Sequence, residues 1–246
     1  MSRGNAPEQH KGALAVELWC IELASDPSGV DWDLLSVDER ARAARFVFDR
    51  DRDRFVAAHA ALRRVLAVYV GCLPAELRFV RDPQGRPSMC GGIALDFNLS
   101  HSGHLALIGV AASGPIGVDI EALRPVVDGA ALAQRHFSPA EIAAWTALPS
   151  SQQDRAFLAC WTRKEACLKA LGMGLSVATN DFEVGVGASP RHLALRSNQE
   201  SVEMTVAGVD VHIDAVAALA TVGPSQVRTI ARGCTELRRG VALIRM

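Results

Sequence analysis

Lysine is scarce in this 246-residue chain, which has 3 lysines against 23 arginines. The arginine excess is typical of a codon bias across a genome, so it says little about partners. The lysines are more informative, because two of them, Lys164 and Lys169, lie five residues apart. In a chain that almost always uses arginine for a positive charge, such a pair indicates a chemical need for ammonium groups at that place.

Three further absences exclude broad classes of protein. The 26 basic and 27 acidic residues give a net charge of -1, which argues against a strongly basic nucleic-acid-binding protein. No apolar run approaches the roughly 18–20 residues that cross a bilayer, and the first ten residues are polar, so we expect no membrane span and no signal peptide. The six cysteines form no C-x-x-C pair, which argues against a zinc site or a disulfide framework and favours a reduced, cytoplasmic location.

The first half of the chain combines strand and helix patterns. Residues 1–12 are predicted to be a disordered tail, and residues 13–23 show the partial alternation of a strand. Ser36 and Glu39 form an S-x-x-E capping box, which predicts the start of a helix. The other elements predicted up to residue 120 are a helix over about 50–70 and strands over 93–99, 104–112 and 116–120.

The second half repeats this style. Ser138 and Glu141 form another capping box, with Pro139 at the first helical position. The other predicted elements are helices over about 128–135 and 153–171 and strands over 181–187, 191–196, 202–206 and 215–221, while 223–246 is left unassigned. The repeated order predicts an α+β fold with two similar halves, residues 13–115 and 116–246.

A first candidate site lies in the segment G-V-D-I-E at residues 117–121. Side chains two apart on a strand point the same way, so Asp119 and Glu121 would share one face while Val118 and Ile120 face a core. Two carboxylates on one face can share a hard divalent cation. The alternative is a solvated strand end that carries acidic residues.

A second candidate site lies on the helix predicted over 153–171. Glu165 and Lys169 are i,i+4 neighbours there, which is the spacing of a surface ion pair worth about 0.2–0.5 kcal/mol. The functional alternative has Glu165 join Asp119 and Glu121 across a cleft to hold Mg²⁺, with the lysines binding phosphate. Spacing alone does not choose between the two.

Two further segments could bind anions. Ser100, His101 and Ser102 stand between two apolar strands, where they could bind an anion or simply satisfy a tight turn. The stretch 40–54 alternates arginine and aspartate, which is typical of a solvated face, although arginine is also a good bidentate phosphate ligand. Arg86 is an isolated cation in another predicted turn.

Taken in order, these motifs resemble the Sfp-type 4′-phosphopantetheinyl transferases. The resemblance runs from about residue 36 to residue 176, and its most diagnostic part is the block W-T-R-K-E-A-C-L-K at 161–169. The other blocks are G-R-P at 85–87, N-L-S-H-S at 98–102, G-V-D-I-E at 117–121 and F-S-x-x-E at 137–141.

The resemblance implies a pseudo-dimer of two similar α+β halves with the active site in the cleft between them. It implies a Mg²⁺-dependent transfer of 4′-phosphopantetheine from coenzyme A to a serine of an apo acyl or peptidyl carrier protein, with release of adenosine 3′,5′-bisphosphate. The implied metal ligands are Asp119, Glu121 and Glu165. The implied contacts with coenzyme A are Arg42, Arg54, Arg86, Ser100, His101, Lys164 and Lys169.

Within this reading, Glu165 is the predicted base for the carrier serine, directly or through a bound water, and Lys169 stabilises the departing phosphate. The chain departs from the family pattern at Arg86, where lysine is usual, and at Glu39, where some members carry a basic residue. A non-catalytic coenzyme A-binding regulator on the same fold is the alternative, and an interaction module with structural charge pairs is a third hypothesis. We expect a monomer with no nucleic-acid or membrane partner.

Overall fold

The computed structural model describes residues 14–173, 177–187, 189–197, 200–223 and 227–232. The strands are β1 (Leu14–Glu22), β2 (Phe79–Arg81), β3 (Pro87–Met89), β4 (Asp96–Ser102), β5 (Leu105–Ala111), β6 (Ile116–Ala122), β7 (Arg191–Ser197), β8 (Glu200–Gly208), β9 (Ala215–Val222) and β10 (Val227–Arg232). The α-helices are α1 (Gly29–Leu34), α2 (Val37–Ala43), α3 (Asp49–Val70), α4 (Gly129–His136), α5 (Pro139–Thr146) and α6 (Ser150–Leu171). Short 3-10 helices are η1 (Pro74–Glu76), η2 (Cys90–Gly92) and η4 (Thr179–Asp181).

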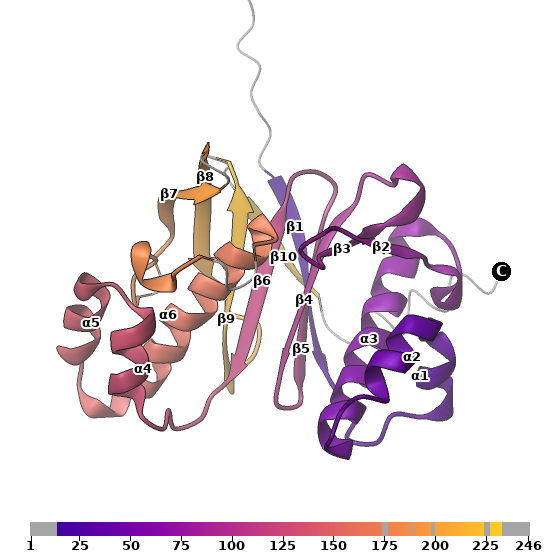
Figure 1. Ribbon diagram of the computed structural model, residues 1–246, viewed down its shortest axis with the longest axis horizontal. Coiled ribbons are helices and arrows are strands. Elements are labelled where there is room, and N and C mark those ends of the chain that lie inside the picture. The colour runs from indigo at the N-terminus through magenta and orange to yellow at the C-terminus, as the bar shows by residue number, and fades with distance from the viewer. Residues whose placement is uncertain (1–13, 174–176, 188, 198–199, 224–226, 233–246) are drawn as a thin grey trace, which may run out of the picture.

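Two four-stranded sheets stand side by side within these residues, and each carries helices on its outer side (Figure 1). The first sheet has the strand order β10-β1-β5-β4 and the second β6-β9-β8-β7, while β2 and β3 form a separate pair. This mixture of helices and sheets confirms the predicted α+β class in its general form. None of the helices in the described segments is both long and apolar enough to cross a membrane.

Apolar side chains fill three layers of this arrangement. Between the sheets, residues such as Leu18 and Leu107 of the first sheet meet Val118 and Leu219 of the second. On the outer faces, α3 packs on the first sheet and α6 packs on the second. Because side chains alternate along a strand, the residues of β6 that lie between its core residues face α6. Asp119 and Glu121 are therefore turned towards that helix.

Most of the predicted elements are present, with shifted ends. The oxygens of Ser36 and Ser138 accept the backbone N–H groups of Glu39 and Glu141, which confirms both capping boxes. The predicted strand over 181–187 is wrong. Two of its backbone donors bond to a side chain and not to a neighbouring strand, since the Glu141 carboxylate accepts the N–H groups of Val184 and Gly185 at 2.7 and 3.0 Å. The tail predicted over 1–12 lies outside the described residues.

The strand β10 crosses the predicted boundary between the halves. It lies parallel to β1 at the edge of the first sheet, with Val16 opposite Thr229. Part of the predicted second half, 116–246, therefore belongs to the first sheet. Parallel partners this far apart in sequence leave no local pattern of their pairing, and the sequence of β10, V-R-T-I-A-R, is too polar to predict a buried strand by itself.

The close packing of α6 on β6 depends on a glycine. A Cβ atom added at Gly117 would collide with the backbone of Ala166 and Ala170, and backbone atoms cannot move aside as a flexible side chain can. Gly117→Ala should therefore lower the free energy of unfolding by about 3 kcal/mol, the upper part of the range for overpacking. Urea unfolding measures this change.

Gly29→Ala is the matched control, because an added Cβ atom there meets nothing within 4 Å. This variant should change the free energy of unfolding by no more than about 0.5 kcal/mol. Equal losses in the two variants would contradict the role assigned to Gly117.

Candidate active site

The two sheets meet at their edge strands β4 and β6, and side chains connect these strands. The Asp96 carboxylate accepts the N–H of Ile116 at 2.7 Å, and the Asn98 side-chain carbonyl accepts the N–H of Val118 at 2.9 Å. Every second residue of β4 thus reaches towards β6. The next two pairs in this series are Ser100 with Asp119 and Ser102 with Glu121.

Asp119 lies at the centre of the site. Its Oδ1 accepts hydrogen bonds from the Ser100 hydroxyl and the Lys169 ammonium, both at 2.6 Å. Lys169 also donates to the Ser100 oxygen at 3.0 Å, so the three side chains form a closed triangle. Asp119 is only 5% exposed, and this burial raises the pKa of its carboxyl group although Lys169 and Ser100 act in the opposite direction.

Glu121 and Glu165 place further negative charge beside Asp119. Glu121 accepts a hydrogen bond from the Ser102 hydroxyl at 2.6 Å and pairs with Arg124 at 2.7 Å. Burial raises the pKa of Glu165, and the charges of Asp119 and Glu121 raise it further, while Lys169 lowers it. The site therefore concentrates carboxylates that repel one another.

This charge pattern favours a bound cation, but the carboxylates do not form a ready-made metal cage. In the part of the chain that the structure describes, no group of three or more histidine, cysteine, aspartate or glutamate side chains is arranged to hold a metal ion. Asp119 instead has the ammonium of Lys169 as its cationic partner.

Three further predicted residues lie near this site. Burial lowers the pKa of His101, and electrostatic interactions with His59, Lys169, Arg54 and Arg42 lower it further, so these side chains share one region. The register of the first sheet explains why His101 lies close to α3. His101 lies opposite Ala106, which packs against α3 beside His59.

We call Arg42, Arg54, His59 and His101 the cationic cluster. The Arg42 guanidinium lies over the Phe55 ring, 5.2 Å from its centroid, and Arg54 approaches the Asp51 carboxylate no closer than 3.9 Å. The two arginines therefore keep most of their charge available for an anion. His59 was not among the predicted site residues, and no motif marked it.

Lys164 differs from its prediction. The residue is fully buried, and its ammonium donates to the carbonyl oxygens of Thr179 and Phe182 at 2.7 and 2.6 Å. It also pairs with the Glu141 carboxylate at 2.7 Å and lies 4.6 Å from the centroid of the Phe182 ring. An ammonium enclosed in this way cannot reach coenzyme A, so the predicted contact is corrected to a structural one.

Arg86 also has protein partners in place of the predicted ligand. Its guanidinium donates to both Asp96 oxygens at 2.9 and 2.7 Å and to the carbonyl oxygens of Ile116, Lys169 and Ala170. The side chain thereby joins β4, β6 and the end of α6. A planar, five-donor group suits these acceptors better than lysine would, which gives a structural reason for the departure from the family pattern.

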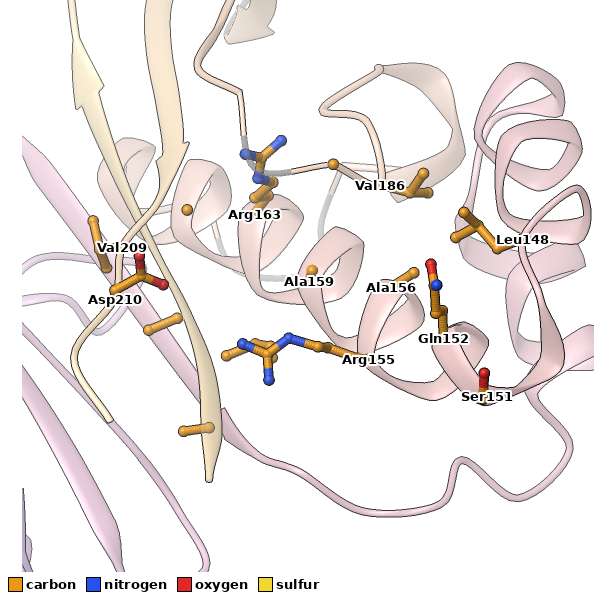
Figure 2. Close-up of a pocket in the computed structure, with 15 residues that line it drawn as sticks. Leu148, Ser151, Gln152, Arg155, Ala156, Ala159, Arg163, Val186, Val209 and Asp210 are labelled. Carbon is orange, nitrogen blue, oxygen red and sulfur yellow. The ribbon is translucent and has the colours of Figure 1, made fainter. Parts of the chain in front are cut away.

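The larger cavities lie around this site without enclosing it. The one in Figure 2, of about 470 Å³, lies between the first turns of α6 and the start of β9, where Arg155 and Asp210 border it. It contains none of the predicted site residues. A cavity of about 520 Å³ opens beside Arg42 and is also lined by Glu39, Arg78 and Arg81.

Comparison with known proteins identifies a family over most of the chain. A model described as "4'-phosphopantetheinyl transferase superfamily" matches residues 115–215, and one described as "4'-phosphopantetheinyl transferase, N-terminal" matches residues 26–113. The chain is 42% identical to "4'-phosphopantetheinyl transferase HetI" of Nostoc sp. over 167 residues, which cover 65% of this chain and 70% of that protein.

Two other relatives extend this comparison. Over 207 residues, or 78% of each protein, the chain is 30% identical to "L-aminoadipate-semialdehyde dehydrogenase-phosphopantetheinyl transferase" of Schizosaccharomyces pombe. It is 29% identical over 150 residues to "4'-phosphopantetheinyl transferase Sfp" of Bacillus subtilis, a match that covers 61% of this chain and 66% of that protein.

Proposed function

Because the chain belongs to the 4′-phosphopantetheinyl transferase superfamily and is an enzyme that transfers phosphopantetheine to carrier proteins, we propose that its donor is coenzyme A and that it requires Mg²⁺. Its active site would lie in the cleft between its two halves. We propose further that the halves form a pseudo-dimer and that the enzyme is monomeric and cytoplasmic.

The observation that carries the proposal is the position of the triangle of Ser100, Asp119 and Lys169. These three side chains come from β4, β6 and α6, so both sheets and the longest helix of the second half contribute to one site. Between β4 and β6, side chains of β4 accept the backbone N–H groups of β6 in place of the backbone hydrogen bonds that would join two strands of one sheet. A site between the two halves can contact two substrates that approach from different sides.

The cationic cluster supports the choice of coenzyme A as the donor. Arg42 and Arg54 would bind its phosphates, because their charges are not neutralised by close carboxylates. His101 would add an imidazole hydrogen bond beside them. The cavity beside Arg42 is also lined by Arg78 and Arg81, so it has the charge that a phosphorylated nucleotide needs.

The carboxylates fit a magnesium ion in their chemistry. Asp119 and Glu165 offer oxygen ligands, and the raised pKa values of both groups show that their negative charges lack full compensation. They would hold the ion, with Glu121 bound directly or through water. A bound Mg²⁺ would offset negative charge on the pyrophosphate of coenzyme A.

The protein side chains would then direct the proton and the leaving group. Glu165 would accept the proton of the carrier serine, whose oxygen forms a bond to the phosphorus that bears pantetheine. The raised pKa of Glu165 makes this carboxylate a better proton acceptor than an ordinary one. Lys169 would donate a hydrogen bond to the departing adenosine 3′,5′-bisphosphate as its P–O bond breaks.

Mass spectrometry of apo carrier proteins tests this proposal. Acyl and peptidyl carriers incubated with the protein, coenzyme A and Mg²⁺ should gain the mass of one phosphopantetheine group, and a chelator should prevent the gain. No gain on any carrier of a broad panel would contradict the proposal. Coenzyme A binding without transfer would instead support the regulator alternative.

A further inference from the structure

Within the cationic cluster, His59 pairs with Glu39, and the proposed transfer reaction does not use this largely buried pair. The Nδ1 atom of His59 lies 3.1 Å from Oε1 of Glu39, and the two side chains are only 14% and 7% exposed. The other Glu39 oxygen accepts the N–H of Ser36 at 2.8 Å and two contacts from the Arg63 guanidinium at 2.8 and 2.7 Å. Glu39 is therefore fixed in place by α2 and α3.

These contacts determine which nitrogen of His59 can exchange a proton. Burial acts to raise the pKa of Glu39, but the hydrogen bonds from His59, Ser36 and Arg63 prevail and lower it to about 2. An ionised carboxylate only accepts hydrogen bonds, so Nδ1 of His59 carries a hydrogen. Nε2 is then the nitrogen that can gain or lose a proton.

The surroundings of His59 place it beside the phosphate-binding region. Its ring stacks on Phe55 with the centroids 4.0 Å apart, and the Arg42 guanidinium lies over the same Phe55 ring. The neighbouring Ala58 packs against Ala106, the residue that lies opposite His101 in the sheet. His59 thus connects α3 to the end of β4 where His101 stands.

The charges around His59 oppose its protonation when no anion is bound. Burial lowers the pKa of His59, Glu39 raises it, and Arg42 on α2 and Arg81 on β2 lower it again. His101 on β4 is a further titratable neighbour, whose own pKa His59 lowers. A phosphate among these cations would reverse the balance, because it attracts the proton that they repel.

We propose that His59, held by Glu39, is a phosphate-binding residue of the donor site and that it takes up a proton from solvent when coenzyme A binds. The inference rests on the proposed function, since coenzyme A supplies the phosphate. It makes the affinity for coenzyme A depend on pH, by at most about tenfold per pH unit for one linked proton. Binding should be tighter on the acid side of neutral pH.

Calorimetry on the full chain tests this linkage. Coenzyme A binding is measured at pH 7 in two buffers of different ionisation enthalpy, and the difference in heat gives the number of protons taken up. We expect wild type to take up a substantial fraction of one proton more than His59→Gln does. The phosphate of coenzyme A also titrates near pH 6, but it is common to both proteins and cancels in the comparison.

Two other variants separate charge from folding. His59→Arg keeps a positive charge at all pH values, so it should bind coenzyme A but lose the extra proton uptake. His104→Gln changes an exposed histidine in the turn after β4 and should behave like wild type. In transfer assays, His59→Gln should raise the KM for coenzyme A several-fold with little change in kcat.

The outcomes distinguish this inference from the function on which it rests. Equal proton uptake by wild type and His59→Gln, with the same pH dependence of affinity, would overturn the inference and leave the transferase proposal intact. A wild-type protein that fails to bind coenzyme A at every pH would overturn both. Thermal unfolding of each variant shows whether a loss of proton uptake comes from misfolding. If His59→Gln is misfolded, the proton uptake of His59→Arg is compared with that of wild type to test the inference.

Discussion

Glu165→Gln is expected to lower kcat for phosphopantetheine transfer by about 10²–10⁴-fold, the usual contribution of a positioned general base. Glutamine has nearly the shape of glutamate but cannot accept the serine proton. The half-buried carboxylate at this position is destabilised by burial and by its neighbour Asp119, which raise its pKa. Its loss should therefore leave the free energy of unfolding unchanged or slightly higher.

Steady-state kinetics and urea unfolding measure the two effects separately. Glu203→Gln, which removes an exposed carboxylate from β8, is the matched control and should change neither quantity. Near-wild-type turnover by Glu165→Gln at saturating Mg²⁺ would show that another group is the base. Activity that returns as Mg²⁺ is raised would show that Glu165 serves mainly to hold the metal.

Lys164→Met is expected to lower the free energy of unfolding by about 3–5 kcal/mol, the typical loss when one partner of a buried ion pair is removed. Methionine fills a similar space but leaves the Glu141 carboxylate, 2% exposed, without its cation. Two carbonyl oxygens, of Thr179 and Phe182, lose their donor as well. The KM for coenzyme A of the folded protein should remain unchanged.

Lys169→Met provides the contrast within the same helix. Its side chain is 28% exposed and its ammonium pairs with Asp119 in the candidate site, so turnover should fall strongly while stability changes much less. The double variant Lys164→Met with Glu141→Gln should recover part of the lost stability, because no buried charge is then left unpaired. A stable Lys164→Met protein with a raised KM for coenzyme A would restore the ligand role first predicted for Lys164.

The two lysines also show why spacing along the sequence does not by itself place side chains in one site. Their separation of five residues suggests a pair. In a helix with 3.6 residues per turn, five residues correspond to about 140° of rotation, so their side chains leave the helix on different sides. Glu165 and Lys169, four residues apart, share one side, whereas Lys164 turns into the core. Its partner, Glu141, lies on another helix and was assigned only a capping role.

The sequence by itself determined the features that depend on near neighbours. Capping boxes at Ser36 and Ser138 involve residues three apart, and the period of a strand places Asp119 and Glu121 on one face. The ordered motifs determined the family. Each capping box and strand face spans fewer than ten residues, so local geometry is enough to interpret it, whereas the family follows from the order of motifs between about residues 36 and 176.

Only the tertiary structure decided which of these charges face the site. It buried Lys164 against Glu141 and engaged Arg86 with three segments of the chain, β4, β6 and α6. It also paired β10 with β1 and placed His59 beside His101. Each outcome depends on a partner far away in sequence. The residue type fixes the charge and the hydrogen-bonding capacity of a side chain. The fold around the side chain decides whether its partner is another group of the protein or a ligand.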